Sequence, residues 1–140
     1  MISNPIFLPL FAMILWTFAA AVYVLRIRTL SVKSGKVSFK YFKTYDSEVP
    51  PREIAQTNRH ITNLFEVPVL FYAVCAVVLA SNYESILILV LAWGFVASRV
   101  AHSIIHLGQN KILPRMITFF VGVLIVLGMW IELLIAHLNA

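Results

Sequence analysis

Four long apolar segments, separated by polar stretches, dominate the pattern of hydrophobic and polar positions along the chain. They cover residues 5–25, 64–81, 85–107 and 116–138, and the first contains no charged residue. Segments of this length can cross the roughly 30 Å apolar core of a bilayer as helices and are too long for barrel strands. We therefore predict membrane-spanning helices over residues 5–25, 55–81, 84–107 and 115–138. The expected fold is an all-α integral membrane four-helix bundle, with residues 1–140 forming a single domain.

The connections between these segments predict the orientation of the bundle. Residues 26–54 form a polar, basic loop, in which Ser34-Gly35 and Pro50-Pro51 are turn signals, and the two later connections are short. An even number of spans places both termini on one side, and basic loops face the cytoplasm. We expect loop 26–54 and the last connection to be cytoplasmic and both termini to be non-cytoplasmic. Because no cleavage site follows the first span, we expect it to be retained.

The composition excludes a soluble or a disordered chain. Hydrophobic residues make up 61% of the sequence and charged residues 12%, against roughly 45–50% and 25% in soluble domains. Of the eleven Lys and Arg, eight lie in residues 26–59, which is the distribution of a cytoplasmic loop. No basic-aromatic recognition module accompanies them, so no nucleic-acid partner is expected. We predict a multi-pass protein of a bacterial inner membrane or, in a eukaryote, of the endoplasmic reticulum. The single cysteine, Cys75, lies in an apolar run and is expected to be a small buried hydrophobe.

Polar residues inside the second span form a first candidate site. Arg59, Asn63 and Glu66 follow the spacing i, i+4, i+7 and therefore share one helix face. Charged groups are costly in a bilayer and usually face a bundle interior or a cavity, where they bind ligands. The alternative is an intramembrane Arg–Glu pair that only fixes helix packing. Pro68 is expected to kink this helix and to free a backbone carbonyl.

A second polar stripe lies in the third span. Arg99, His102 and His106 follow the spacing i, i+3, i+7, and a tight turn makes this span an antiparallel neighbour of the second. Both stripes are therefore expected at the same depth. Two histidines four residues apart can bind one metal ion, but nearby arginines disfavour a cation, and no metal is predicted.

Arginines of the first and fourth spans complete the predicted site. Arg26 ends the first span and Arg115 begins the fourth, so basic side chains from all four helices are expected at one depth. Arg115 could also simply mark the interface by snorkelling. A net-positive site suits an anionic ligand, because guanidinium groups bind carboxylates through two hydrogen bonds. With Glu66 available for an amine, glutathione fits this chemistry.

Two segments resemble the MAPEG superfamily, the membrane-associated proteins in eicosanoid and glutathione metabolism. RHITNLFEVPVLFY (59–72) is similar to the signature of its second span. RVAHSIIHLGQNKILPR (99–115) is similar to the third span and following loop of the microsomal prostaglandin E synthase and glutathione transferase branch. The two segments together, in order and in the expected spans, identify the chain as a bacterial-type member.

The resemblance implies a homotrimer with glutathione, as co-substrate, bound between neighbouring subunits. It implies that Arg115 stabilises the thiolate, since a fixed cation lowers the pKa of a thiol. A lipophilic substrate and membrane lipid are the other implied partners. The resemblance implies glutathione contacts by Arg26, Arg59, Asn63, Glu66 and His102. From the polar stripe of the third span, we expect Arg99 and His106 to bind it as well.

Four positions depart from the pattern of the prostaglandin synthase branch, and at one of them Thr62 replaces a further arginine or polar contact. His106 and Phe119 stand where tyrosines are usual, and Met116 stands in place of a serine. The leading hypothesis is a glutathione-dependent transferase or peroxidase. The alternatives are a non-catalytic lipid-binding or scaffold member and a small transporter or channel subunit, in which the intramembrane Glu and His would relay protons.

Overall fold

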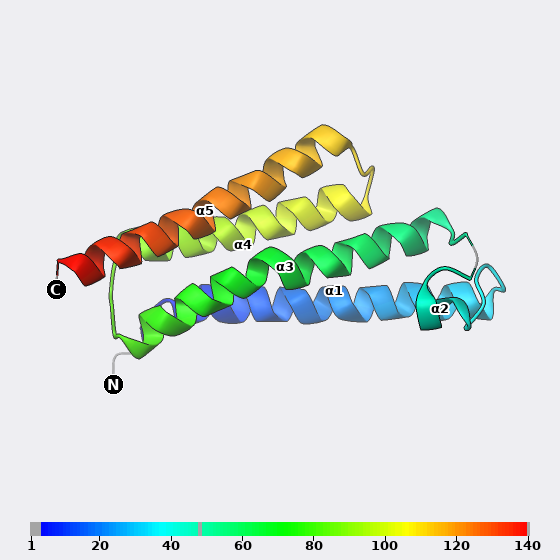
Figure 1. Cartoon of the computed structure of the whole chain (residues 1–140), viewed down its shortest axis with the longest axis horizontal. Coiled ribbons are helices and arrows are strands. Elements are labelled where there is room, and N and C mark those ends of the chain that lie inside the picture. Colours follow the sequence, from blue (N-terminus) through cyan, green and yellow to red (C-terminus); the bar gives the residue numbers. More distant parts are fainter. Residues whose placement is uncertain (1–3, 48, 140) are drawn as a thin grey trace.

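A computed structural model describes residues 4–47 and 49–139 and shows an all-helical chain (Figure 1). Its helices are α1 (Phe7–Lys33), α2 (Tyr41–Thr44), α3 (Arg52–Ala80), α4 (Ile86–Leu107) and α5 (Ile112–Leu138). All but α2 are long and apolar enough to cross a membrane. The predicted all-α membrane fold with four spans is confirmed, and the chain is an integral multi-pass membrane protein.

The four long helices run up and down in two pairs. Helix α1 packs against α3, and α4 packs most extensively against α5 (Figure 1). Both termini lie at one end of the bundle, together with the turn between α3 and α4. The connections from α1 to α3 and from α4 to α5 lie at the opposite end, which we call the basic end because it holds most of the lysines and arginines. Which end faces the cytoplasm stays a prediction.

The helices depart from the predicted spans near the basic end. Helix α1 continues to Lys33 instead of ending at residue 25, because no helix-breaking residue precedes Ser34-Gly35 and Gly35 then adopts a positive φ of 71°. The predicted loop over residues 26–54 is thus partly helical, because it contains the end of α1 and the whole of α2. Helix α5 begins at Ile112, since Pro114 is tolerated in a first turn, where the missing N–H would have no helical partner. Helix α3 continues through Pro68.

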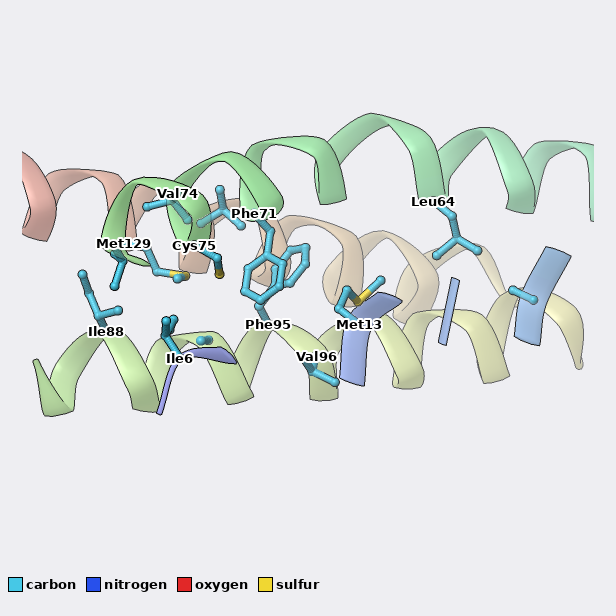
Figure 2. Close-up of a cluster of buried hydrophobic side chains, with 14 residues drawn as sticks. Ile6, Met13, Leu64, Phe71, Val74, Cys75, Ile88, Phe95, Val96 and Met129 are labelled. Carbon is cyan, nitrogen blue, oxygen red and sulfur yellow. The ribbon is translucent and has the colours of Figure 1, made fainter. Parts of the chain in front are cut away.

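An apolar core joins all four long helices. The rings of Phe71 in α3 and Phe95 in α4 stack with centroids 4.4 Å apart, and Figure 2 shows them at the centre of the cluster. Met13 enters from α1 and Met129 from α5, and both are fully buried. Cys75 is also fully buried in this cluster, as predicted. This core fixes the relative register of the helices and so positions the polar groups nearer the basic end.

Hydrogen bonds between spans supplement the apolar packing. The indole Nε1 of Trp16 in α1 donates to Oγ of Ser103 in α4 over 3.1 Å. At the end that carries the termini, Oε1 of Glu132 accepts from the hydroxyl groups of Tyr83 and Ser85, each over 3.1 Å. Because water is scarce in a bilayer, such bonds satisfy polar groups that would otherwise be unpaired.

Candidate functional site

A cavity of about 560 Å³ opens at the basic end between α3, α4 and α5. Arg59 and Asn63 of the second-span stripe and His102 and His106 of the third-span stripe line it, whereas Glu66 and Arg99 do not. The residues that line this cavity, called the basic-end pocket below, are Asn58, Arg59, Thr62, Asn63, His102, His106, Ile112, Arg115, Met116, Phe119 and Phe120.

Helix α3 contributes polar side chains to the basic-end pocket on two adjacent ridges. Asn58 and Thr62 are four residues apart, as are Arg59 and Asn63, so each pair lies one above the other on the same side of α3. Arg59 is exposed, whereas Asn63 is half-buried. An exposed guanidinium above a half-buried amide offers a ligand both a charged anchor at the mouth and a neutral hydrogen-bonding group deeper in.

Helix α4 contributes two buried imidazoles. His102 is 4% exposed and His106 is 1% exposed, and their rings meet edge to face with centroids 5.6 Å apart. Nδ1 of His102 lies 3.1 Å from the backbone oxygen of Arg115 and 3.3 Å from Oγ1 of Thr118. Because a carbonyl oxygen only accepts, Nδ1 carries the hydrogen in its contact with Arg115. These contacts hold His102 against the first two turns of α5.

Arg115 is the second arginine of the basic-end pocket. Its side chain is held by a residue of the α4–α5 connection. Its Nη1 donates to Oδ1 of Asn110 over 2.7 Å. Asn110 adopts a positive φ of 52°, a conformation that asparagine tolerates better than most residues. The bond fixes the direction of the guanidinium and uses only one of its five N–H donors, which leaves others for an anion.

The pocket is basic on one side and apolar on the other. Within the part of the chain that the structure describes, its lining holds two arginines and two histidines and no carboxylate. The apolar side is formed by Ile112, Met116, Phe119 and Phe120 of α5. This arrangement suits a molecule that carries an anionic group and an apolar group, or an anion beside a lipophilic reaction partner.

Arg99 lies outside the lining and ties α4 to α5. It is 2% exposed, and its Nη2 donates to the backbone oxygens of Thr118 (3.3 Å) and Phe119 (2.9 Å). Its Cζ also lies 5.2 Å from the ring centroid of Phe95 and 5.4 Å from that of Phe119. Because Phe119 lines the pocket, Arg99 supports the pocket wall from behind.

Arg26 and Glu66 also lie outside the lining and are exposed on α1 and α3. The structure of one subunit thus brings together Arg59, Asn63, His102, His106 and Arg115. The roles of Arg26 and Glu66 stay predictions that depend on a neighbouring subunit. No group of three or more His, Cys, Asp or Glu in residues 4–47 and 49–139 is arranged to hold a metal ion.

Several residues near the site were not found from the sequence, among them two asparagines, a glutamine and a histidine. Asn58 lines the pocket and Asn110 holds Arg115, while Gln56 donates from Nε2 to the backbone oxygen of His106. His60 is fully buried, with its ring centroid 5.5 Å from that of His106. The sequence did contain a signal for the burial of His60, because His60 and Leu64 have the i, i+4 spacing of one helix face, and both lie on the buried face of α3. The role of Asn110 depends on loop geometry that no periodicity encodes.

The fold and the pocket define a class of protein: a multi-pass membrane protein with a basic, partly apolar pocket between its spans. The MAPEG family model matches residues 6–135, nearly the whole chain, and the chain belongs to this family. Membership connects the protein in general terms with eicosanoid and glutathione metabolism in membranes. No curated protein and no solved structure matches the chain.

Proposed function

We propose that this protein is a membrane-bound, glutathione-dependent transferase or peroxidase that activates the glutathione thiol at Arg115. The observation that carries the proposal is the convergence of Arg59, Asn63 and Arg115 in one pocket. The Arg59 guanidinium suits a carboxylate of glutathione, and the Asn63 amide suits its peptide groups. The oriented guanidinium of Arg115 favours thiolate over thiol.

The proposed chemistry begins with loss of the thiol proton to solvent. In the transferase reaction, the thiolate sulfur forms a bond to an electrophilic carbon and the leaving group departs with its bonding electrons. In the peroxidase reaction, the sulfur attacks a hydroperoxide, the O–O bond breaks, and an alcohol and a glutathione sulfenic acid form. A second glutathione then yields the disulfide and water.

The apolar side of the basic-end pocket supports a lipophilic second substrate. Met116 and Phe120 are about half exposed, at 47% and 55%, on the membrane-spanning α5. A substrate dissolved in the bilayer could reach the thiolate along these side chains without crossing water.

The proposed assembly is a homotrimer that completes the site. Exposed Arg26 and Glu66 would then contact glutathione from a neighbouring subunit, with Glu66 at the amine. Native mass measurement in detergent should give three copies of the chain. A monomer that still binds glutathione would contradict a site between subunits.

Thiolate formation tests the proposed activity most directly. Glutathione is titrated into detergent-purified protein at neutral pH while ultraviolet thiolate absorbance is followed. We expect a saturable signal that falls at least tenfold in Arg115→Ala. Lys111→Ala is the matched control, because Lys111 is an exposed cation outside the pocket lining, and it should keep the wild-type signal. A wild-type protein without signal, or an unchanged signal in Arg115→Ala, would overturn the proposal.

The second candidate function is a non-catalytic lipid-binding or scaffold member of the family. Met116 and Phe119 in the lining favour it, because neither side chain can donate a hydrogen bond to a thiolate. Saturable lipid binding without any thiolate signal would support this candidate, and turnover that depends on Arg115 would exclude it.

A further inference from the structure

A second cavity lies at the basic end between α1, α2 and α3, beside the site described above. Its volume is about 460 Å³. We call it the Arg28 cavity. The side chains of its lining that matter here are those of Arg28, Tyr41, Tyr45, Ala55, Asn58 and Arg59. It shares only Asn58, Arg59 and Thr62 with the basic-end pocket, so most of its wall is separate.

Arg28 is held in a fixed orientation in this cavity. Its Nη2 donates to Oδ1 of Asn58 over 2.8 Å, and its Cζ lies 5.5 Å from the ring centroid of Phe42 and 5.9 Å from that of Tyr45. Its Nε is buried and has no hydrogen-bond partner among residues 4–47 and 49–139. Since a buried N–H without an acceptor is costly, this guanidinium is suited to an added anion.

The charges around the Arg28 cavity also favour an anion. Among residues 4–47 and 49–139, its lining contains two arginines and the two phenol groups of Tyr41 and Tyr45, and no carboxylate. Residues 26–59 hold eight Lys and Arg against three Asp and Glu, which accounts for the whole formal net charge of +5. Helix α1 has 27 residues, about 40 Å at 1.5 Å per residue, so Arg28 near its C-terminal end lies where the helix leaves the apolar core.

A smaller apolar groove lies farther into the membrane along the same two helices. Its volume is about 210 Å³, and its lining among the described residues comes from α1 and α3 and includes Ala21 and Phe65. Ala21 lies seven residues before Arg28, and Phe65 lies seven residues after Asn58. Residues seven apart share a helix face, so both cavities lie on one side of the α1–α3 pair. This groove suits an acyl chain attached to the anion.

We propose that the Arg28 cavity binds the phosphate of an anionic membrane phospholipid, with an acyl chain in the groove between α1 and α3. The Arg28 guanidinium donates to the phosphate oxygens, and the phenol groups offer further donors. The apolar groove favours a lipid over free phosphate. The proposal rests on no step of glutathione chemistry, so either proposal can fail alone.

Native mass spectrometry of the detergent-purified full chain can count bound lipid. A short-chain phosphatidylglycerol is titrated as a soluble monomer, so that no charged vesicle surface contributes. We expect one lipid per subunit and at least tenfold weaker binding in Arg28→Gln. Lys43→Gln is the matched control, because it removes the same charge from an exposed position in α2 outside the lining. It should stay within twofold of wild type.

A second pair of variants covers a failure of Arg28→Gln to fold. Ala55 lines the Arg28 cavity but not the basic-end pocket. Ala55→Glu places a carboxylate in the cavity, and Ala55→Gln adds nearly the same volume without charge. We expect Ala55→Glu to weaken lipid binding at least fivefold relative to Ala55→Gln.

Three outcomes would overturn the proposal. If Arg28→Gln and Lys43→Gln weakened lipid binding equally, general surface charge and not the Arg28 cavity would account for the binding. Displacement of the lipid by an equal concentration of inorganic phosphate would make the site one for free phosphate. Displacement by glutathione, or an Arg28→Gln defect confined to glutathione binding, would assign the cavity to the thiol site.

Discussion

Two arginines of the membrane-spanning helices differ in what surrounds the guanidinium. Arg99 donates to backbone carbonyls and is sealed between aromatic rings, whereas Arg115 is half-buried and lines the basic-end pocket. The orientation of Arg115 depends on Asn110, whose side-chain oxygen accepts from its Nη1. At the residue scale, the site thus depends on a side chain of the α4–α5 connection.

Replacing Asn110 with glycine tests this dependence. Glycine keeps the positive φ without strain and removes only the hydrogen bond, so the backbone should be unchanged. Because the guanidinium is then less well oriented, we expect about fivefold weaker glutathione binding or thiolate formation. Gln109→Gly, at a neighbouring exposed amide, is the control and should have less effect on the same thiolate titration. An unchanged titration in Asn110→Gly would contradict a positioning role.

At the scale of helices, Arg99 and Gly122 determine how closely α4 and α5 pack. Gly122 is buried, and a Cβ there would overlap Nη2 of Arg99 and lie 2.8 Å from its Cζ. A glycine at this position therefore makes room for the guanidinium that donates to the carbonyls of α5. Breaking this contact would leave a buried charge without its acceptors, which is strongly destabilising.

Gly122→Ala should destabilise the bundle by about 2–4 kcal/mol, since the overlap must displace either Arg99 or α5. Thermal unfolding in detergent should show this as a melting temperature lower by several degrees. Gly128→Ala on the same helix is the control, because its Cβ would meet only Cδ1 of Leu91, at an ordinary 3.7 Å. Equal melting temperatures for the two variants would contradict the proposed role of the Arg99 contact beside Gly122 in holding α4 against α5.

At the scale of the whole molecule, the two ends of the bundle have different chemistry. The basic end holds the two cavities and the cluster of lysines and arginines, and the other end holds both termini. A basic end is expected to be cytoplasmic. Both proposed ligands, glutathione and an anionic headgroup, would then enter from the cytoplasmic side.

Labelling of introduced cysteines tests this orientation. Cys75 is the only native cysteine and is fully buried, so background labelling should be low. A membrane-impermeant maleimide should label Lys43→Cys in inside-out vesicles but not in intact cells. Glu84→Cys, in the turn between α3 and α4 at the other end, should show the reverse. The opposite pattern would invert the predicted topology.

Much of the fold was predictable from hydropathy, because a bilayer requires long apolar helices and the chain has four such segments. The sequence also revealed that Arg59 and Asn63 would share a face with each other, and His102 with His106. Helix ends were predicted less well. The helix continued past Arg26 to Lys33, since charged residues at a membrane interface do not end a helix, whereas the positive φ of Gly35 does.

The sequence by itself determined the membrane class, the four spans and the depth at which polar side chains lie, because periodicity and burial in lipid act within one helix. Only the tertiary structure decided that Arg99 packs against α5, that Arg115 faces the basic-end pocket, and that Asn110 holds it. These outcomes depend on contacts between helices and on loop conformation. Spacing along one helix defines a face but does not say what the neighbouring helix places against it.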